Sequence, residues 1–177
     1  MTTAEALAFL QAHQPMPDDE HLNLQPELML AYDEVLQHLR EHPDPRCIPL
    51  LLRSFGGWDG FGMYQTVEQV LYRFDEHVVV AELYQNLEQA ASLSLYTLYW
   101  QVELSIVFAH ACLFEPLAVV LNHPIADIRI SAASALGMVG SLSRLDAGRV
   151  VRELQRQLAV EDDGDVADAL REALEEL

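Results

Sequence analysis

Apolar side chains recur at intervals of three and four residues along almost the whole chain. This spacing places them on one face of an α-helix, and the strict alternation typical of a half-buried strand is scarce. Proline, glycine and capping residues divide the pattern into about ten segments. We therefore predict an all-α protein whose helices cover residues 3–12, 26–42, 44–55, 63–74, 76–90, 95–109, 112–122, 126–139, 146–160 and 165–176.

The ends of several predicted helices carry recognisable signals. Thr2, followed by Glu5 three residues later, forms a capping box for the first helix. Pro26 opens the second helix at a position that tolerates proline, and Pro43 ends it. Residues 14–25 contain two prolines and an acidic run, and we predict a loop there. Further helix N-caps are expected at Asp75 and at Ser92 or Ser94.

The apolar stripe of each predicted helix identifies its core side chains. The clearest stripes are Leu28, Leu30, Ala31, Val35, Leu36 and Leu39; Ile48, Leu51, Leu52 and Phe55; Val67, Val70, Leu71 and Phe74; Val79, Leu83 and Leu87; and Leu95, Leu98, Val102, Ile106 and Ala109. The two cysteines, Cys47 and Cys112, lie in apolar helical contexts without a metal-binding spacing. We expect both to be reduced core residues.

The most regular stretch is LAVVLNHPIADIRISAASALGMVG at residues 117–140. After its turn, Asp127 and Arg129 open a helix, and small residues such as Ala132 and Ala135 allow close packing. This stretch resembles a HEAT repeat, in which the Asp and Arg after the turn commonly form a ladder between neighbouring repeats. Weaker resemblance extends over 44–74, 75–109 and 146–176. The resemblance implies a right-handed α-α superhelix of HEAT-like helical hairpins.

A stack of helix pairs also follows from the amount of apolar surface that each pair must bury. One pair of about 30 residues cannot cover its own stripe, whereas several pairs in series can. Residues 1–42 and 161–177 each carry eight acidic side chains and one Arg, as expected of polar end caps. We therefore expect a single domain over 1–177, with 43–160 as the central repeats.

The net charge of −18 narrows the range of partners. Surfaces that bind nucleic acid need clustered Lys and Arg, so we expect no nucleic-acid partner. An acidic surface speeds encounter with a basic protein. The chain shows neither a signal peptide nor an uninterrupted apolar run of membrane-spanning length, so we expect no membrane association and a cytoplasmic location. The oligomeric state stays open at this point.

The sequence offers little for catalysis. His38 and His42 lie four residues apart at a helix end, where the helix dipole already favours histidine, and no zinc-protease motif surrounds them. The Gly-rich segment 56–62 lacks the GK[ST] of a phosphate-binding loop. We expect no metal, no cofactor and no catalytic residue.

Candidate binding residues follow from the resemblance, because the second helix of each HEAT pair usually lines the concave face. On 63–74 the residues opposite the core stripe are Gln65, Glu68, Gln69 and Tyr72; on 95–109 they are Tyr96, Trp100, Glu103 and Val107, with Tyr99 at the flank. On 126–139 they are Ile130, Ala133, Ser134 and Gly137. Trp58 and Asp59 lie at the centre of the Gly-rich segment, where Trp58 either packs against a helix or faces a partner.

These features favour a non-catalytic protein-binding module with a basic protein partner. Small size, acidic charge and uneven repeats resemble bacterial immunity proteins of polymorphic toxin systems, which often cover a basic nuclease toxin with acidic side chains. Two alternatives remain open from the sequence. One is a scaffold or adaptor of a larger complex, and the other is a HEAT-like enzyme of the DNA glycosylase or bilin lyase type. The glycosylase cleft is basic, which disagrees with the charge of this chain.

Overall fold

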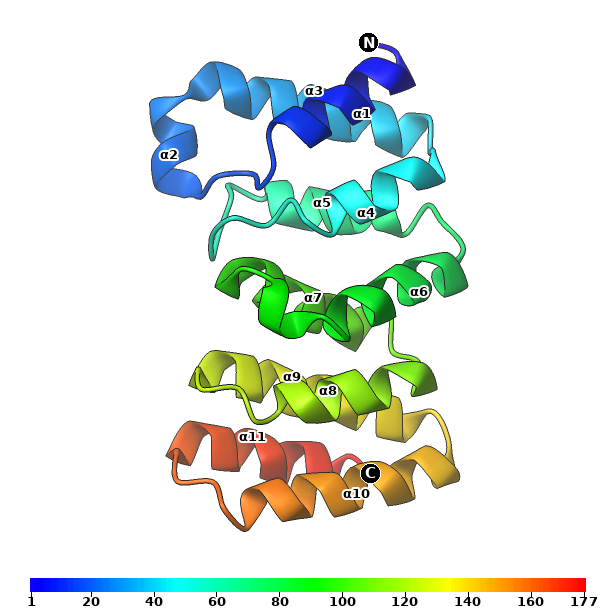
Figure 1. Ribbon diagram of the computed structural model, residues 1–177, viewed down its shortest axis with the longest axis vertical. Coiled ribbons are helices and arrows are strands. Elements are labelled where there is room, and N and C mark those ends of the chain that lie inside the picture. Colours follow the sequence, from blue (N-terminus) through cyan, green and yellow to red (C-terminus); the bar gives the residue numbers. More distant parts are fainter. The chain divides into compact units, whose positions relative to one another are not determined.

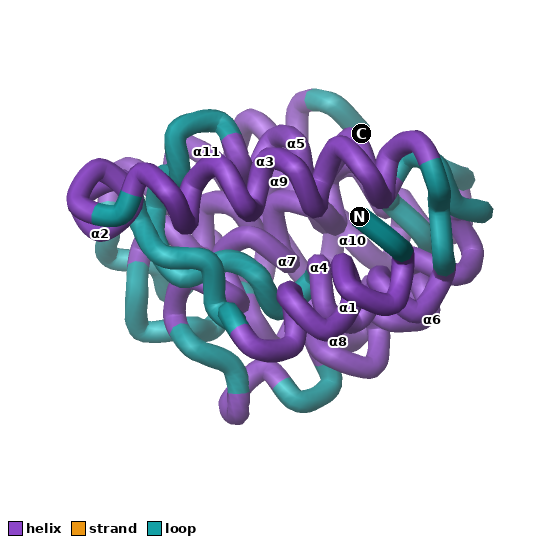
Figure 2. The backbone as a smooth tube through the Cα atoms, turned by 90° about the horizontal axis from the view of Figure 1, so that it is seen from above, coloured by secondary structure: helices purple, strands orange, loops and turns teal.

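The computed structural model describes all 177 residues, and its secondary structure is entirely helical (Figure 1). Figure 2 shows the same chain as helices and loops without a strand, which confirms the all-α prediction. None of the helices has the length and apolar character that a membrane span requires. The α-helices are α1 (Thr3–Ala12), α2 (Asp19–Leu24), α3 (Pro26–Glu41), α4 (Ile48–Leu51), α5 (Met63–Leu71), α6 (Glu76–Leu87), α7 (Leu95–Val107), α8 (Phe114–Val120), α9 (Ala126–Ser141), α10 (Arg144–Leu158) and α11 (Gly164–Glu175). Short 3₁₀ helices cover Pro45–Cys47, Ala90–Ser92 and Ala111–Leu113.

The chain forms two compact units. Unit 1 comprises Met1–Glu82 and Ser94–Thr97, and unit 2 comprises Leu83–Leu93 and Leu98–Leu177. Helices α6 and α7 each contribute residues to both units.

Unit 1 has two layers of helices, with α1 and α4 in front of α3 and α5 in the view of Figure 1. Helix α1 packs against α3 and α4, and α5 packs against the same two helices. Their apolar stripes meet between the layers, where Leu10, Leu36, Ile48 and Val67 are fully buried. The helices therefore bury the faces that the sequence pattern predicted.

Unit 2 is organised around α9, which contacts α8, α10 and α11. Small residues on α9 make this possible, since a Cβ atom at Gly137 would lie 3.3 Å from the Cβ of Ala173 on α11. The prediction that Ala133 and Gly137 face outward is therefore wrong, because both are buried. Ser134 is exposed as predicted, and Ile130 is half-buried.

Several helix ends follow the sequence signals closely. The Thr2 hydroxyl accepts a hydrogen bond from the backbone N–H of Glu5, and the Glu5 carboxylate accepts one from the N–H of Thr2, which confirms the capping box. Asp75 and Ser94 accept hydrogen bonds from backbone N–H groups in the first turns of α6 and α7.

The loop predicted over residues 14–25 is wrong in its second half, which contains α2. Asp18 is the N-cap of α2, and its carboxylate accepts a hydrogen bond from the backbone N–H of His21. Asp19 and Glu20 occupy the first turn, where negative charge interacts favourably with the helix dipole. The acidic run that indicated a loop thus marks the start of a short helix.

Two further expectations about burial fail. Leu30 was predicted to point inward, but 65% of its surface is exposed, because it lies on the side of α3 opposite the buried Val35 and Leu39. Cys112 was predicted in the core, yet it is exposed at the start of α8, whereas Cys47 is buried as expected. Both cysteines are free thiols.

A buried ion pair ties α9 to the turn between α10 and α11. The Arg129 guanidinium donates hydrogen bonds to both carboxylate oxygens of Glu161, at 2.8 and 3.1 Å, and to the backbone carbonyls of His123 and Pro124. The side chains of Arg129 and Glu161 are only 12% and 3% exposed. One guanidinium therefore closes the turn before its own helix and binds the turn of the following helix pair.

The surroundings of Glu161 favour its charged form. Burial by itself raises the pKa of this carboxyl, but hydrogen bonds from Arg129, Gln157 and the backbone N–H of Asp163 outweigh that effect and lower it overall. A carboxyl with a lowered pKa contributes stability above its ordinary titration range and loses it as the pH falls.

Replacing Arg129 should test this pair. We expect Arg129→Met to lower the free energy of unfolding at neutral pH by about 3 kcal/mol, because the buried Glu161 carboxylate loses its only charged partner and keeps the uncharged donors Gln157 and the Asp163 N–H. The loss should shrink as the pH falls below the ordinary range of a glutamate, where Glu161 becomes neutral. Urea denaturation over a pH series measures both effects. Arg156→Met removes the exposed pair with Glu153 and is the matched control, for which we expect little change.

Candidate protein-binding surface

Residues 56–62, here called the aromatic loop, are held in place by a segment about 40 positions earlier in the chain. Met16 and Phe55 form an isolated parallel β-bridge, and the Met16 N–H donates to the Ser54 carbonyl at 2.6 Å. On the other side, the Thr97 hydroxyl donates to the Phe55 carbonyl at 3.0 Å. The loop thus begins from a backbone position that is fixed on two sides.

Glycine is required where the aromatic loop touches this earlier segment. A Cβ atom at Gly56 would lie 2.4 Å from the Met16 carbonyl oxygen, and one at Gly57 would lie 2.5 Å from the Cβ of Asp18. Neither approach leaves room for a side chain. Gly56 and Gly57 therefore serve close backbone packing.

Two polar side chains, those of Tyr64 and Asp19, also hold the aromatic loop in place. The buried Tyr64 hydroxyl accepts a hydrogen bond from the Gly56 N–H and donates to the Met16 carbonyl, both at 3.2 Å. Burial raises the pKa of Tyr64 to about 12, so the hydroxyl keeps the proton that it donates. Asp19 accepts a hydrogen bond from the Phe61 N–H at 2.6 Å. Helix α2, which the sequence analysis missed, therefore supports the far end of the loop.

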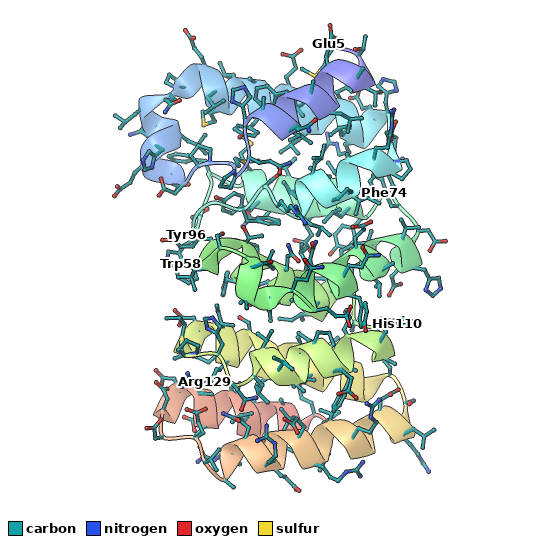
Figure 3. All side chains as sticks on the ribbon, in the orientation of Figure 1. Glu5, Trp58, Phe74, Tyr96, His110 and Arg129 are labelled. Atoms are coloured by element: carbon teal, nitrogen blue, oxygen red, sulfur yellow. The ribbon has the colours of Figure 1, made fainter.

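The braced loop presents aromatic side chains to solvent. Trp58 is 44% exposed and Phe61 is 51% exposed. Tyr96, in the first turn of α7 and also part of unit 1, packs edge-to-face with Trp58 at a centroid distance of 5.1 Å, and Figure 3 shows the two side by side. The sequence left open whether Trp58 is covered or presented, and the structure shows a ring that is supported on one side and exposed on another.

Asp59 and Phe61 complete this exposed group. Asp59 is exposed, and one of its oxygens accepts a hydrogen bond from the Gly60 N–H at 2.7 Å. Phe61 was absent from the predicted site, although an aromatic residue between two glycines was an available signal. Its backbone has a φ of +48°, an uncommon value that the contact with Asp19 stabilises.

The predicted residues on α5 and just after it form a second exposed group in unit 1. Tyr72 is exposed, and its hydroxyl donates to the Glu68 carboxylate at 2.5 Å. Partial desolvation and this carboxylate raise the pKa of Tyr72 to about 12. Gln69 is exposed and accepts a hydrogen bond from Arg40 on α3 at 3.3 Å. Gln65 is also exposed.

The remaining predicted residues belong to unit 2. The rings of Tyr99 and Trp100 are half-buried and pack edge-to-face at 5.8 Å. Glu103 accepts a hydrogen bond from the Ser131 hydroxyl at 2.5 Å, so part of its bonding capacity joins α7 to α9. Burial, followed by the charges of Glu103 and Asp127, raises the pKa of Tyr99. Val107 is exposed, as predicted.

The electrostatic environment of the aromatic loop is acidic. Unit 1 carries fourteen Asp and Glu residues against four Arg. His38 and His42 lie with ring centroids 4.8 Å apart, and no group of three or more metal-ligating side chains forms anywhere in the chain.

The chain was compared with family models, curated proteins and solved structures, and none of them matches it.

The bracing of the aromatic loop predicts a cost for adding one methyl group at Gly56. We expect Gly56→Ala to lower the free energy of unfolding by about 1 to 3 kcal/mol, because the new Cβ atom collides with the Met16 carbonyl. Chemical denaturation measures the change. Gly164→Ala is the control, since a Cβ atom there meets nothing within 4 Å. A Gly56→Ala protein as stable as Gly164→Ala would contradict the bracing.

Proposed function

We propose that the protein is a non-catalytic binding module that docks a basic protein partner through the aromatic loop and its acidic surroundings. The braced loop carries the proposal. Trp58 and Phe61 are exposed on a backbone that contacts with Met16, Asp19 and Tyr64 hold in place. Their apolar surface therefore loses little conformational freedom when a partner binds. Tryptophan is also enriched among the residues that dominate binding energy.

Recognition would then proceed in two stages. The acidic side chains of unit 1 attract a positively charged partner and raise the association rate. Trp58, with Tyr96 at its edge, then fills an apolar site on the partner while the Asp59 carboxylate pairs with Lys or Arg at the margin. The exposed Tyr72 and the half-buried Glu68 supply a second aromatic and acidic group.

Within this role we propose a HEAT-type repeat protein and, more narrowly, a bacterial immunity protein for a basic toxin. The Arg129–Glu161 pair supports the HEAT assignment, because an Arg after the turn of one helix pair binds the turn of the next, as in the ladder of that family. The acidic charge supports neutralisation of a basic partner. Both assignments rest on likeness of pattern and charge, and fold alone does not determine function.

A pull-down from the native host with the tagged chain, at low and at high salt, tests the proposed function. We expect recovery of one basic protein at low salt and its loss at high salt, because screening weakens the attraction between exposed charges. A toxin encoded beside this chain would support the immunity role. Recovery of many proteins, or of one that salt does not release, would favour a scaffold and contradict the electrostatic mechanism.

Removing the Trp58 ring tests the site itself. We expect Trp58→Ala to weaken binding of the recovered partner by about 2 kcal/mol, or roughly thirtyfold in Kd. Isothermal titration measures the affinity, and circular dichroism checks that the fold is intact. Tyr84→Ala in unit 2 removes a ring outside the predicted site and should leave the affinity unchanged. Trp100→Ala shows separately whether unit 2 contributes. Unchanged affinity in a folded Trp58→Ala protein would remove the aromatic loop from the site.

A further inference from the structure

Helix α10 differs in charge from the rest of the chain. It carries four of the ten Arg residues but only two acidic ones. At 100° per residue, Leu145, Arg149, Arg152 and Arg156 fall on one face, and all four are exposed. We call this row the basic stripe. It begins with Leu145, whose side chain is 85% exposed, the highest value among the large apolar residues.

The basic stripe is positioned by neighbours within unit 2. Arg149 pairs with Glu115 at 2.6 Å and lies over the Phe114 ring, 4.2 Å from its centroid. Arg156 pairs with Glu153 on its own helix. Arg152 forms no ion pair within the chain. The stripe thus combines two oriented guanidinium groups with one that is available for an acidic surface.

Helix α3 in unit 1 carries a row of matching chemistry. Glu27, Leu30, Glu34 and Glu41 fall on one exposed face, which we call the acidic stripe. Leu30, buried by prediction and exposed in the structure, lies in this row. An open hollow of about 580 Å³ adjoins it at Glu27 and is lined by Leu24, Gln25, Pro26, Glu27, Leu28 and Ala31.

We propose that the basic stripe of one molecule docks on the acidic stripe of a second copy of this chain. The basic stripe carries three Arg and the acidic stripe three Glu, each row includes one exposed leucine, and the helices have similar lengths of 15 and 16 residues. A second copy is the partner because the complementary acidic row belongs to the chain itself. This inference does not depend on the proposed function.

Such a contact joins two different surfaces. In a dimer, one molecule therefore keeps an unused acidic stripe and the other keeps an unused basic stripe. Larger assemblies therefore form as the protein concentration rises, unless the arrangement closes into a ring. The net charge of −18 opposes association at long range. At physiological ionic strength, charges farther apart than about 8 Å are largely screened, and the local Arg–Glu contacts then decide.

Sedimentation velocity over a wide concentration range tests the contact. We expect the weight-average mass of the wild-type protein to rise with concentration. Arg152→Glu should weaken self-association about tenfold or more, because it places like charges opposite each other. Arg171→Glu is the matched control, since it makes the same change at an exposed position on α11. A wild-type protein that stays monomeric, or equal effects of Arg152→Glu and Arg171→Glu, would overturn the proposal.

Mixing two variants separates this contact from any symmetric one. Arg152→Glu leaves the acidic stripe intact, and Glu34→Arg leaves the basic stripe intact. Each variant alone should associate about tenfold or more weakly than the wild type, whereas an equimolar mixture should recover association, because the unchanged Arg152 of one variant meets the unchanged Glu34 of the other and the two reversed charges also attract each other. Combining both changes in one chain should restore self-association. Failure of the mixture to associate, with both variants folded by circular dichroism, would overturn the pairing of these two stripes.

Discussion

Burial of apolar stripes between helix layers is the constraint on which both units depend. The helices are short, down to four residues in α4 and seven in α8, and helices of such length are not stable alone in water. Each becomes stable only when the next layer covers its stripe, as α9 does for α8, α10 and α11. The small residues of α9 then decide how closely the layers approach, as at Gly137, which packs against Ala173, and at Gly140, which packs against Val150.

Polar contacts act where this packing ends, at the turns. Arg129 donates hydrogen bonds to two turn carbonyls and to the buried Glu161 carboxylate, so one side chain joins two turns. In unit 1 the Tyr64 hydroxyl similarly forms hydrogen bonds with the Gly56 N–H and the Met16 carbonyl. Both devices join segments that are distant in sequence, and both leave neighbouring side chains free to face solvent.

The sequence predicted much of what depends on local pattern and missed what depends on distant contacts. The capping box at Thr2 and the stripe residues of α4 follow from spacing alone, and the structure confirms them. Exposure of Leu30 could have been deduced, because at 100° per residue it falls on the face of Glu27, Glu34 and Glu41 and opposite the buried Leu39. The bracing of the aromatic loop was hidden, since Met16 and Asp19 precede it by about 40 residues. Phe61 was missed although its position between Gly60 and Gly62 was a local signal.

The aromatic loop separates positions that hold its shape from positions that it displays. Gly56 and Gly57 are fixed by the backbone atoms they touch, so substitution there disturbs the fold. Trp58, Asp59 and Phe61 follow these glycines in the loop and have exposed side chains. Mutation can therefore alter the displayed residues at little cost in stability. A few substitutions at these positions can therefore change the surface chemistry of the loop while the architecture that supports it stays unchanged.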